Sequence, residues 1–488
     1  MSITVEVGLL SGKTAAVKAA AHERVAELKH RAQIALEVGP GRLVDSHGTV
    51  LDASASIKQS GVQSGDSLTL HISRTQACGS SRAFAGILGD GRVATWGHGA
   101  LGGDSRSIQD QSQDVQQIQA SEGAGGAILG DGSVVTWGDV DHGGDSSSVQ
   151  DQLKNVQQIQ ASLRAFAAIL VDGSVITWGG GGWGGDSHHL QNPLKNQLRG
   201  GQQIQATAAA FAAILGDGSV VTWGGAGDGG DSSAVQHQLK HVQQIQASGS
   251  AFAARGGDGS VVTWGDAVAG GDSGGVQAQL GNVQQIQATS LAFAALLADG
   301  SVVSWGTVGD GGGVQHQLKN VQQIQASEGG GAAILGDGSV DRLKNVQWIQ
   351  ASRRAFAAIL GDGSVVTWGA AGSGGDSNAV QNQLKNVQQI QANDCAFAAI
   401  LGDGSVVTWG KAACGGDSRD VQRQLRKVQS IQASDQAFAA ILDDGSVVTW
   451  GDNDLVRHVS LPSLHSGGQN VAVLNLNLGS ARRRYSKG

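Results

Sequence analysis

A unit of about 41 residues is repeated along most of this chain, and no other feature constrains its fold as strongly. Residues 161–179 are ASLRAFAAILVDGSVITWG, and residues 392–410 are ANDCAFAAILGDGSVVTWG. The Asp-Gly step of the unit occurs ten times; seven of the nine intervals are 41 or 45 residues long, and the others are 38 and 25. Units of such arrays pack on their neighbours, so we expect one repeat domain of ten units. The ten aspartates are Asp90, Asp131, Asp172, Asp217, Asp258, Asp299, Asp337, Asp362, Asp403 and Asp444.

Each unit is expected to form three short β-strands, VQQIQAS, AFAAIL and SVVTWG. The Asp-Gly step between the last two strands is a strong hairpin signal. Alternation along the second strand puts Phe166 and Ala168 on one face and Ile169 on the other. Both faces are apolar, so we expect sheets that pack face to face, with roughly 1.5–3 kcal/mol from each buried Phe. The eight Phe residues, all at this position, are Phe84, Phe166, Phe211, Phe252, Phe293, Phe356, Phe397 and Phe438.

The size of the unit predicts a mainly β fold in which each repeat is one blade of a β-propeller. The segment from the Trp-Gly step to VQxQLKN is polar and turn-rich, and we expect a short outer strand there. A β-solenoid is the alternative, although solenoid coils are usually shorter and lack a tight hairpin.

Several units depart from the pattern. Gly125 and Gly331 stand where Phe is expected, and Arg255 replaces an apolar residue of the second strand. Loss of a core aromatic ring costs roughly 3–5 kcal/mol if nothing fills the space. The unit that begins near Ser327 loses its Trp-Gly step, so we expect half a blade there. Such units are either decayed copies or adapted binding surfaces.

Composition excludes several classes of protein. With 40% hydrophobic and 15% charged residues, the chain is not a disordered one. A net charge of -8 argues against a nucleic-acid binder. Cys78, Cys395 and Cys414 form no CxxC pair, which argues against metal or disulfide roles. No secretory signal or membrane span is visible, so we expect a soluble cytoplasmic or nuclear protein that does not bind membranes.

The unit I-Q-A-S-x-x-A-F-A-A-I-L-G-D-G-S-V-V-T-W-G, followed by G-G-D, resembles the repeat of the regulator of chromosome condensation family. The resemblance covers residues 76–452, and D-G-S-V-V-T-W-G is its most specific part. It implies a propeller that usually has seven blades. This sequence departs from the family pattern, because Ser or Thr replaces the Gly after the first strand and Ala-Phe replaces the His position. Since ten units exceed seven, we expect seven or more blades.

Residues 1–73 have a different pattern, a strand–strand–helix–strand–strand order. The helix is predicted from Val25, Leu28, Ala32 and Leu36, which recur at helical spacing. With LLSGKT, RLV and DSLTLHI in place, this segment resembles ubiquitin, which implies a small α+β (β-grasp) domain. Arg74-Thr75-Gln76 replaces the Gly-Gly terminus, so the domain cannot be conjugated. The resemblance implies a receptor-facing patch at Leu10, Val44 and His71, or residues there that only support the fold.

Two further sets of residues are candidate partner-binding sites on the propeller loops. Seven units carry Gly-Gly-Asp-Ser after the Trp-Gly step. If these turns share one face of the propeller, their aspartates would attract a basic protein surface. The alternative is that the residues serve only to form turns. A calcium site is less well supported, since blades rarely converge on one ion. The third unit carries an insertion with Trp183, His188 and His189. The seven aspartates are Asp104, Asp145, Asp186, Asp231, Asp272, Asp376 and Asp417.

The expected organisation is a ubiquitin-like domain over residues 1–73, a propeller over 74–455, and a closing segment with a basic tail over 456–488. We expect a protein-interaction scaffold, either linked to the ubiquitin pathway as an adaptor without its own ligase domain or docking a basic protein. No cofactor, metal or enzyme activity is expected, because no catalytic motif appears and repetition disfavours a single site. The alternatives are guanine-nucleotide exchange on a small GTPase, implied by the family resemblance, and a decayed or structural array.

Overall fold

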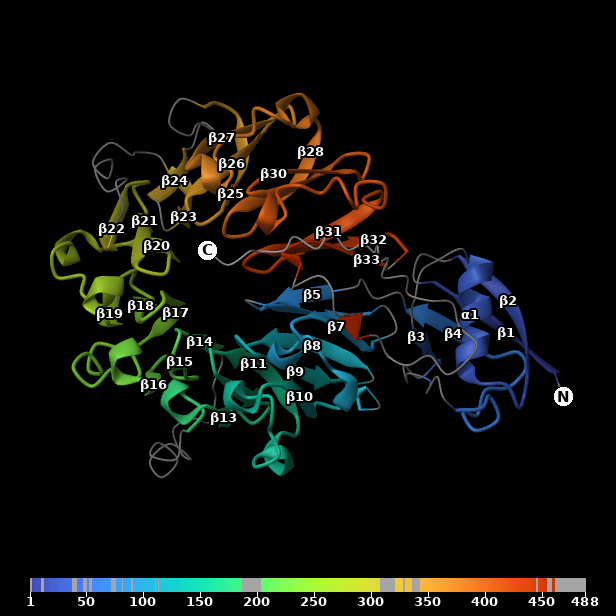
Figure 1. Ribbon diagram of the computed structural model, residues 1–488. Helices are drawn as coiled ribbons and strands as arrows, with labels where there is room; N and C mark the ends of the chain where they lie inside the picture. Colours follow the sequence, from blue (N-terminus) through green and yellow to red (C-terminus); the bar gives the residue numbers. More distant parts are fainter. Residues whose placement is uncertain are drawn as a thin grey trace, which may run out of the picture.

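A computed structural model describes most of the chain (Figure 1). The described residues are 2–9, 13–36, 42–46, 51, 55–71, 76–80, 82–88, 91–109, 111–112, 114–186, 203–307, 321–327, 330–335, 343–444, 446–453 and 459–460. Within these ranges, no helix combines the length and the apolar character needed to cross a membrane.

The N-terminal part is a four-stranded sheet with one helix. The order in the sheet is β2-β1-β4-β3; β1 is antiparallel to β2 and parallel to β4. The apolar face of α1 packs on alternate residues of the strands, such as Val5, Val7 and Leu43. The element order is the one expected from the sequence. The elements are β1 (Ser2–Gly8), β2 (Thr14–Ala20), α1 (Val25–Leu36), β3 (Arg42–Val44) and β4 (Ser67–His71).

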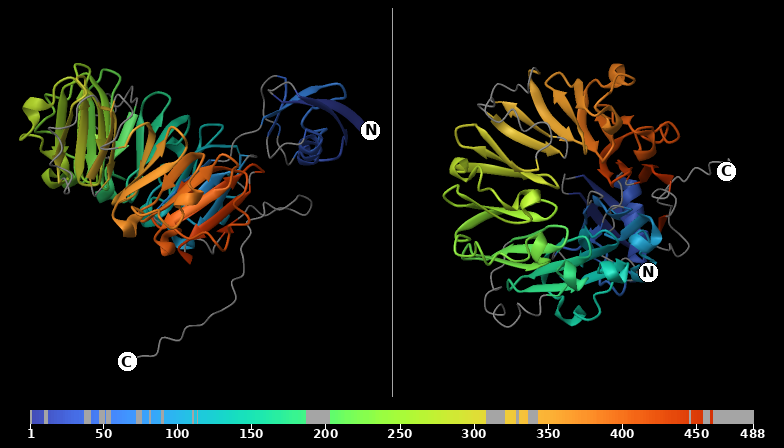
Figure 2. Two further views of the ribbon diagram at one scale, coloured as in Figure 1. Left: turned by 90° about the horizontal axis from the view of Figure 1, so that it is seen from above. Right: turned by 60° about the vertical axis from the view of Figure 1, so that its left-hand side comes forward.

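The repeats form ten small antiparallel sheets that follow one another around a common centre (Figures 1 and 2). Eight of these sheets have three strands that run in sequence order, with the middle strand hydrogen-bonded to both neighbours; the one in the eighth unit is given below, and the other seven follow here. The strands are β8 (Val115–Ala120), β9 (Ala124–Leu129), β10 (Val134–Gly138), β11 (Val156–Ala161), β12 (Ala165–Leu170), β13 (Val175–Gly179), β14 (Gln203–Ala206), β15 (Ala210–Ile214), β16 (Val220–Gly224), β17 (Val242–Ala247), β18 (Ala251–Gly256), β19 (Val261–Gly265), β20 (Val283–Ala288), β21 (Ala292–Leu297), β22 (Val302–Gly306), β28 (Val387–Ala392), β29 (Ala396–Leu401), β30 (Val406–Gly410), β31 (Val428–Ala433), β32 (Ala437–Leu442) and β33 (Val447–Gly451).

Three sheets need separate mention. The first contains β5 (Gln76–Gly79), β6 (Ala83–Ile87), β7 (Val93–Gly97) and β34 (Val459–Ser460). Among the described residues, the seventh consists of β23 (Val321–Ser327) and β24 (Gly330–Leu335), which agrees with the half blade expected there. The eighth is regular and consists of β25 (Val346–Ala351), β26 (Ala355–Leu360) and β27 (Val365–Gly369).

The described segments between sheets form short helical turns, so the outer strand expected there is wrong. The Ser and Gln of the turn bond to the edge of the third strand instead, as Gln150 does to the carbonyl of Val134. The turns are η1 (Gly99–Leu101), η2 (Arg106–Ile108), η3 (Val140–His142), η4 (Gln150–Gln152), η5 (Gly181–Trp183), η6 (Ala226–Asp228), η7 (Ala267–Gly271), η8 (Gln277–Gln279), η10 (Ala371–Ser373), η11 (Gln381–Gln383) and η12 (Ala412–Cys414).

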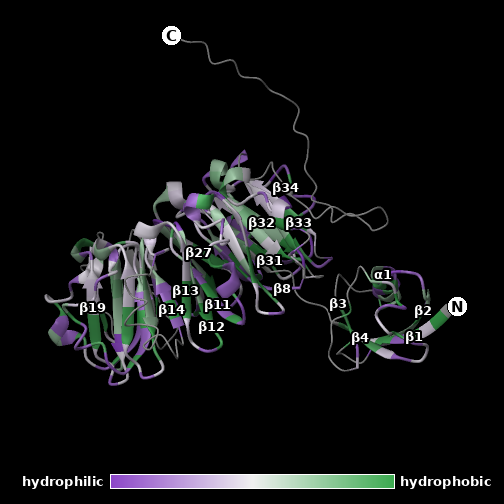
Figure 3. Cartoon of the chain, turned by 90° about the horizontal axis from the view of Figure 1, so that it is seen from below, coloured by the Kyte–Doolittle hydropathy of each residue, from purple (hydrophilic) through white to green (hydrophobic). Residues whose placement is uncertain are grey.

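The core consists of layers between successive sheets. One face of β12 contributes Phe166 and Ala168 to a cluster with Ala124 and Ile128 of the preceding unit. Ile169, on the opposite face, packs with residues of the following unit. The predicted alternation is therefore confirmed, and Figure 3 shows the hydrophobic residues gathered along the strands.

Each Phe stacks on the Trp of its own unit, and in six of these eight pairs the Trp is seen to donate a hydrogen bond to the unit before it. The ring centroids of Phe166 and Trp178 lie 5.3 Å apart, and Trp178 Nε1 donates to the carbonyl of Gly143 over 3.1 Å. Gly143 has φ +90°, and a β-carbon there would lie 2.6 Å from the Phe166 ring. The first Gly of Gly-Gly-Asp-Ser is thus required by its conformation and by the neighbouring ring.

The second unit fills the space of its missing Phe with its own Trp. A β-carbon on Gly125 would lie 2.2 Å from the Trp137 ring, so the ring occupies the place of the absent side chain. The expected cavity is therefore not present there. In the fifth unit the half-buried Arg255 directs its guanidinium to Gln243 Oε1 at 3.3 Å, while its buried Nε has no partner within the described chain.

The array closes on itself. Phe84 and Trp96 of the first sheet form one cluster with Ala437 and Ile441 of the last, and a β-carbon on Gly79 would clash with the Ala433 carbonyl at 2.5 Å. β34 extends the first sheet beyond β7, so residues from both ends of the array share that sheet. An open solenoid would not close in this way.

Candidate functional site

The strand directions give the array two different ends. The loop between the first and second strands lies beside the helical turn that follows the third strand; in the third unit, Gly180 N donates to Arg164 O over 2.8 Å, and Ser162 Oγ donates to Trp183 O over 2.9 Å. We call this end, made of those loops and turns, the loop face. The Asp-Gly hairpins lie at the other end of the strands, which we call the hairpin face.

A chain of backbone hydrogen bonds links successive loops on the loop face. The amide of Leu163 donates to the carbonyl of Ala208 over 3.0 Å, and the amide of Ala208 donates to Gly249 over 2.8 Å. The same bond recurs at Glu122–Leu163, Gly249–Ser290, Arg353–Asp394 and Asp394–Asp435. Because these bonds use only backbone atoms, the side chains of the loops are not needed for the linkage.

The loop face is where units differ from one another. The second residue of the loop between the first and second strands, which is Leu163 in the third unit, is Ser, Glu, Leu, Ala, Gly, Arg or Asp in different units. The hairpin face, in contrast, keeps Asp-Gly in all ten units. Four of the seven large hydrophobic side chains that are exposed in the described chain also lie on the loop face. They are Val140 at 64%, Leu163 at 39%, Val268 at 61% and Leu291 at 45% exposed.

Two units show which contacts the variable loop-face residues form. In the second unit, the buried His142 lies between two carboxylates, with Nδ1 3.3 Å from Asp139 and Nε2 3.7 Å from Glu122. The adjacent His142 imidazole lowers the pKa of Asp139. In the third unit, the Arg164 guanidinium lies over the half-buried Trp183 ring at 4.9 Å. His188 and His189, proposed beside Trp183, lie outside the described residues.

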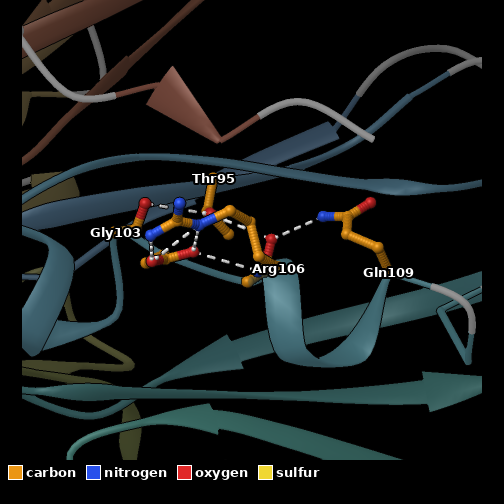
Figure 4. Close-up of polar contacts among 6 residues, drawn as sticks. Thr95, Gly103, Arg106 and Gln109 are labelled. Carbon is orange, nitrogen blue, oxygen red and sulfur yellow. Dashed lines mark hydrogen bonds and ion pairs between the residues drawn. The ribbon is translucent and has the colours of Figure 1, made fainter. Parts of the chain in front are cut away.

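The Gly-Gly-Asp-Ser segment runs beside the third strand of its sheet, and we call this position the rim; Figure 4 shows the contacts around Thr95, Gly103, Arg106 and Gln109 in the first unit. Asp104 Oδ1 accepts the Arg106 amide over 3.0 Å and also binds the Arg106 guanidinium. Ser105 is buried and bonds to Thr95 over 2.9 Å and to Gln109 over 2.8 Å. The spacing Thr…Ser…Gln, ten and four residues apart, is present in the sequence, but the prediction had not used it.

The same turn is found in the other units. Asp145, Asp231, Asp272, Asp376 and Asp417 each accept the amide two residues further on, at 2.7–3.1 Å. Asp186 is exposed. These bonds account for the recurrence of Asp in the turn, and docking of a basic partner there stays a prediction. Within the described chain, no group of three or more His, Cys, Asp and Glu residues could hold a metal ion.

The patch proposed for the N-terminal part is partly described. The register pairs Val44 with Thr69 and Arg42 with His71, which puts positions 44 and 71 on the same side of the sheet. The other side carries the buried residues Leu43 and Leu70. Leu10 lies outside the described residues.

No protein-family model and no curated protein matches the sequence. Among solved structures, the chain is similar to Prp20p of Saccharomyces cerevisiae, with 14% identity, coverage of 79% of this chain and 94% of that one, and a TM-score of 0.37. It is also similar to the computationally designed Ika8 protein (15% identity, coverage 69% and 96%, TM-score 0.32) and to human WBSCR16 (15%, 76% and 87%, 0.33). Prp20p has binding properties toward Gsp1p and histones. At this level of similarity, the neighbours do not define the partners of this chain.

The closed succession of repeated antiparallel sheets defines a repeat protein of β-propeller type.

Proposed function

We propose that this protein is an interaction scaffold whose repeat array binds a protein partner on the loop face. The observation that carries the proposal is the contrast between the two ends of the array. Core and hairpin positions repeat almost without change, whereas neighbouring positions of the loop face differ in size, charge and polarity from unit to unit. A purely structural array has no reason to concentrate its variation at one end.

The chemistry of the loop face suits a protein surface. Leu163 and Val268 are exposed, Glu122 N donates to the carbonyl of Leu163, and the exposed Arg353 occupies the loop position equivalent to Leu163 in the eighth unit. Protein interfaces combine apolar contact with a polar rim and are enriched in Arg and aromatic residues. The stacked Arg164 and Trp183 fit this description. We accordingly propose binding and not catalysis for this face.

A finer proposal concerns the N-terminal part and the blade number. A mixed sheet with one helix, and a shared side for positions 44 and 71, support a ubiquitin-like domain that docks the scaffold to ubiquitin-pathway proteins. Ten sheets around one centre support a ten-bladed propeller. The described loops of the loop face have only about three residues each, too short for the wedge that nucleotide exchange requires, so no exchange activity is proposed.

Differential capture from a cell extract tests the proposal. We compare the full chain with the loop-face variant Leu163→Ser/Val268→Ser and with the hairpin-face variant Val171→Ser, since Val171 is 73% exposed. The expected result is loss of specific partners for the first variant and retention for the second. Equal capture by all three chains, or loss only with Val171→Ser, would contradict the proposal. A chain lacking residues 1–73 should lose ubiquitin-pathway proteins alone, and their retention would contradict the finer proposal.

A further inference from the structure

Two of the three cysteines, distant in sequence, meet on the loop face of the ninth unit. Cys395 ends the loop before β29, and Cys414 is the last residue of η12. Cys414 is 2% exposed, whereas Cys395 is half-buried and packs on the same apolar cluster. The absence of a close cysteine pair in the sequence argued against a disulfide. The fold, however, brings Cys395 and Cys414 together in one cluster.

The backbone around both residues is fixed by three hydrogen bonds. Lys411 N donates to Cys395 O over 3.0 Å, and Cys414 N donates to Lys411 O over 3.0 Å. Asn393 Nδ2 donates to Cys414 O over 2.6 Å. The loop and the turn that carry the two thiols are therefore held against each other without any contribution from sulfur.

The second unit shows how closely the equivalent two positions approach each other. Its bonds are the same: Asp139 N donates to Gly123 O, His142 N to Asp139 O, and Ser121 Oγ to His142 O. A β-carbon built on Gly123, the equivalent of Cys395, lies 2.9 Å from Cγ of His142, the equivalent of Cys414. A disulfide requires β-carbons about 3.5–4.5 Å apart. A β-to-γ separation this short is compatible with that requirement.

The two thiols differ in accessibility and reactivity. Burial is the main cause that raises the pKa of Cys414 to about 11, and the adjacent Cys395 thiol contributes to this increase. Cys414 therefore stays protonated and inert toward reagents in solution. Cys395, which is more accessible, is the thiol that a small molecule reaches first.

We propose that Cys395 and Cys414 form a reversible redox site, oxidised to an intramolecular disulfide by a low-molecular-weight disulfide such as glutathione disulfide. The Cys395 thiolate attacks one sulfur of the reagent, and the first glutathione leaves as a thiolate. Cys414 then attacks the Cys395 sulfur of the mixed disulfide, its proton passing to the second glutathione as that thiolate leaves. Two protein thiols are oxidised, and one glutathione disulfide is reduced to two thiols. This inference is independent of the proposed scaffold function.

The test uses the folded full chain with glutathione disulfide, followed by thiol counting and peptide mass spectrometry. The unmodified chain should lose two of its three thiols and yield a 395–414 cross-linked peptide without retained glutathione. Cys414→Ser should keep glutathione on Cys395, whereas Cys395→Ser should react far more slowly. Cys78→Ser is the matched control and should form the same cross-link, because Cys78 lies in the first sheet and packs in a different cluster. Three unreacted thiols, or a stable glutathione adduct on Cys395 of the unmodified chain, would overturn the proposal.

Discussion

The contacts between sheets and the loop face are built from adjacent residues but follow opposite rules. Between sheets, the same Phe, Trp and Gly recur, because each residue must fit the unit beside it. On the loop face, the repeated bonds between neighbouring loops run from backbone amide to backbone carbonyl, so these bonds do not depend on which side chain each loop carries. The residues that form contacts between sheets are therefore uniform from unit to unit, whereas the loop-face residues, which we propose bind a partner, are diverse. Three pairs of substitutions test this difference.

The largest effect is expected from Gly229→Ala. Gly229 has φ +92°, and a β-carbon there would lie 2.6 Å from the Phe252 ring. Backbone strain and overpacking each cost about 1–3 kcal/mol, so we expect a loss of roughly 3 kcal/mol in the free energy of unfolding. Urea denaturation followed by Trp fluorescence measures it. The matched control is Gly227→Ala, two residues away on the loop face, where a β-carbon would meet nothing within 4 Å. Equal losses for both would contradict the distinction.

A smaller effect is expected from Trp264→Phe. Trp264 Nε1 donates to the Gly229 carbonyl over 2.9 Å, and removal of the donor leaves that carbonyl without its partner. The expected loss is about 1–3 kcal/mol. Trp368→Phe is the control: Trp368 is half-buried next to the two-stranded sheet, and no hydrogen bond to it is found within the described chain. We expect a clearly lower urea midpoint for Trp264→Phe alone, and similar midpoints would show that the bond between units contributes little.

The smallest effect on stability is expected at the residue just before the first strand of each unit, which adopts the left-handed backbone conformation. His241 has φ 53°, and Asn282 occupies the equivalent position with φ 56°. Asn tolerates this conformation better than most residues, so His241→Asn should stabilise the array by about 0.5 kcal/mol. Asn282→His should lower the thermal midpoint by a comparable amount. Shifts of the same sign for the two exchanges would contradict this explanation.

Much of the fold could be predicted from the sequence because its determinants are local. The Asp-Gly step and the alternation around Phe166 fix the hairpin and the two apolar faces of each sheet. The outer strand was predicted wrongly, because Thr, Ser and Gln side chains occupy the strand edge in its place. The contacts that close the array were not predicted, because they join residues from its two ends, such as Phe84 and Ala437.

The candidate site was less predictable. The Gly-Gly-Asp-Ser aspartates drew attention by repetition, yet their oxygens serve local turns on the rim. The residues that distinguish one unit from another, such as Leu163 and His142, form no motif. The meeting of Cys395 and Cys414 depends on a turn that folds back on a loop, which sequence spacing does not reveal.

Hydrogen–deuterium exchange of the full chain, alone and bound to a captured partner, tests the central claim most directly. If the loop face is the binding surface, exchange should slow in loops 121–123, 162–164 and 352–354 and in turns η3 and η5, while the Asp-Gly hairpins stay unchanged. Protection confined to the hairpins or to the Gly-Gly-Asp-Ser rim, with the loop face unchanged, would contradict it.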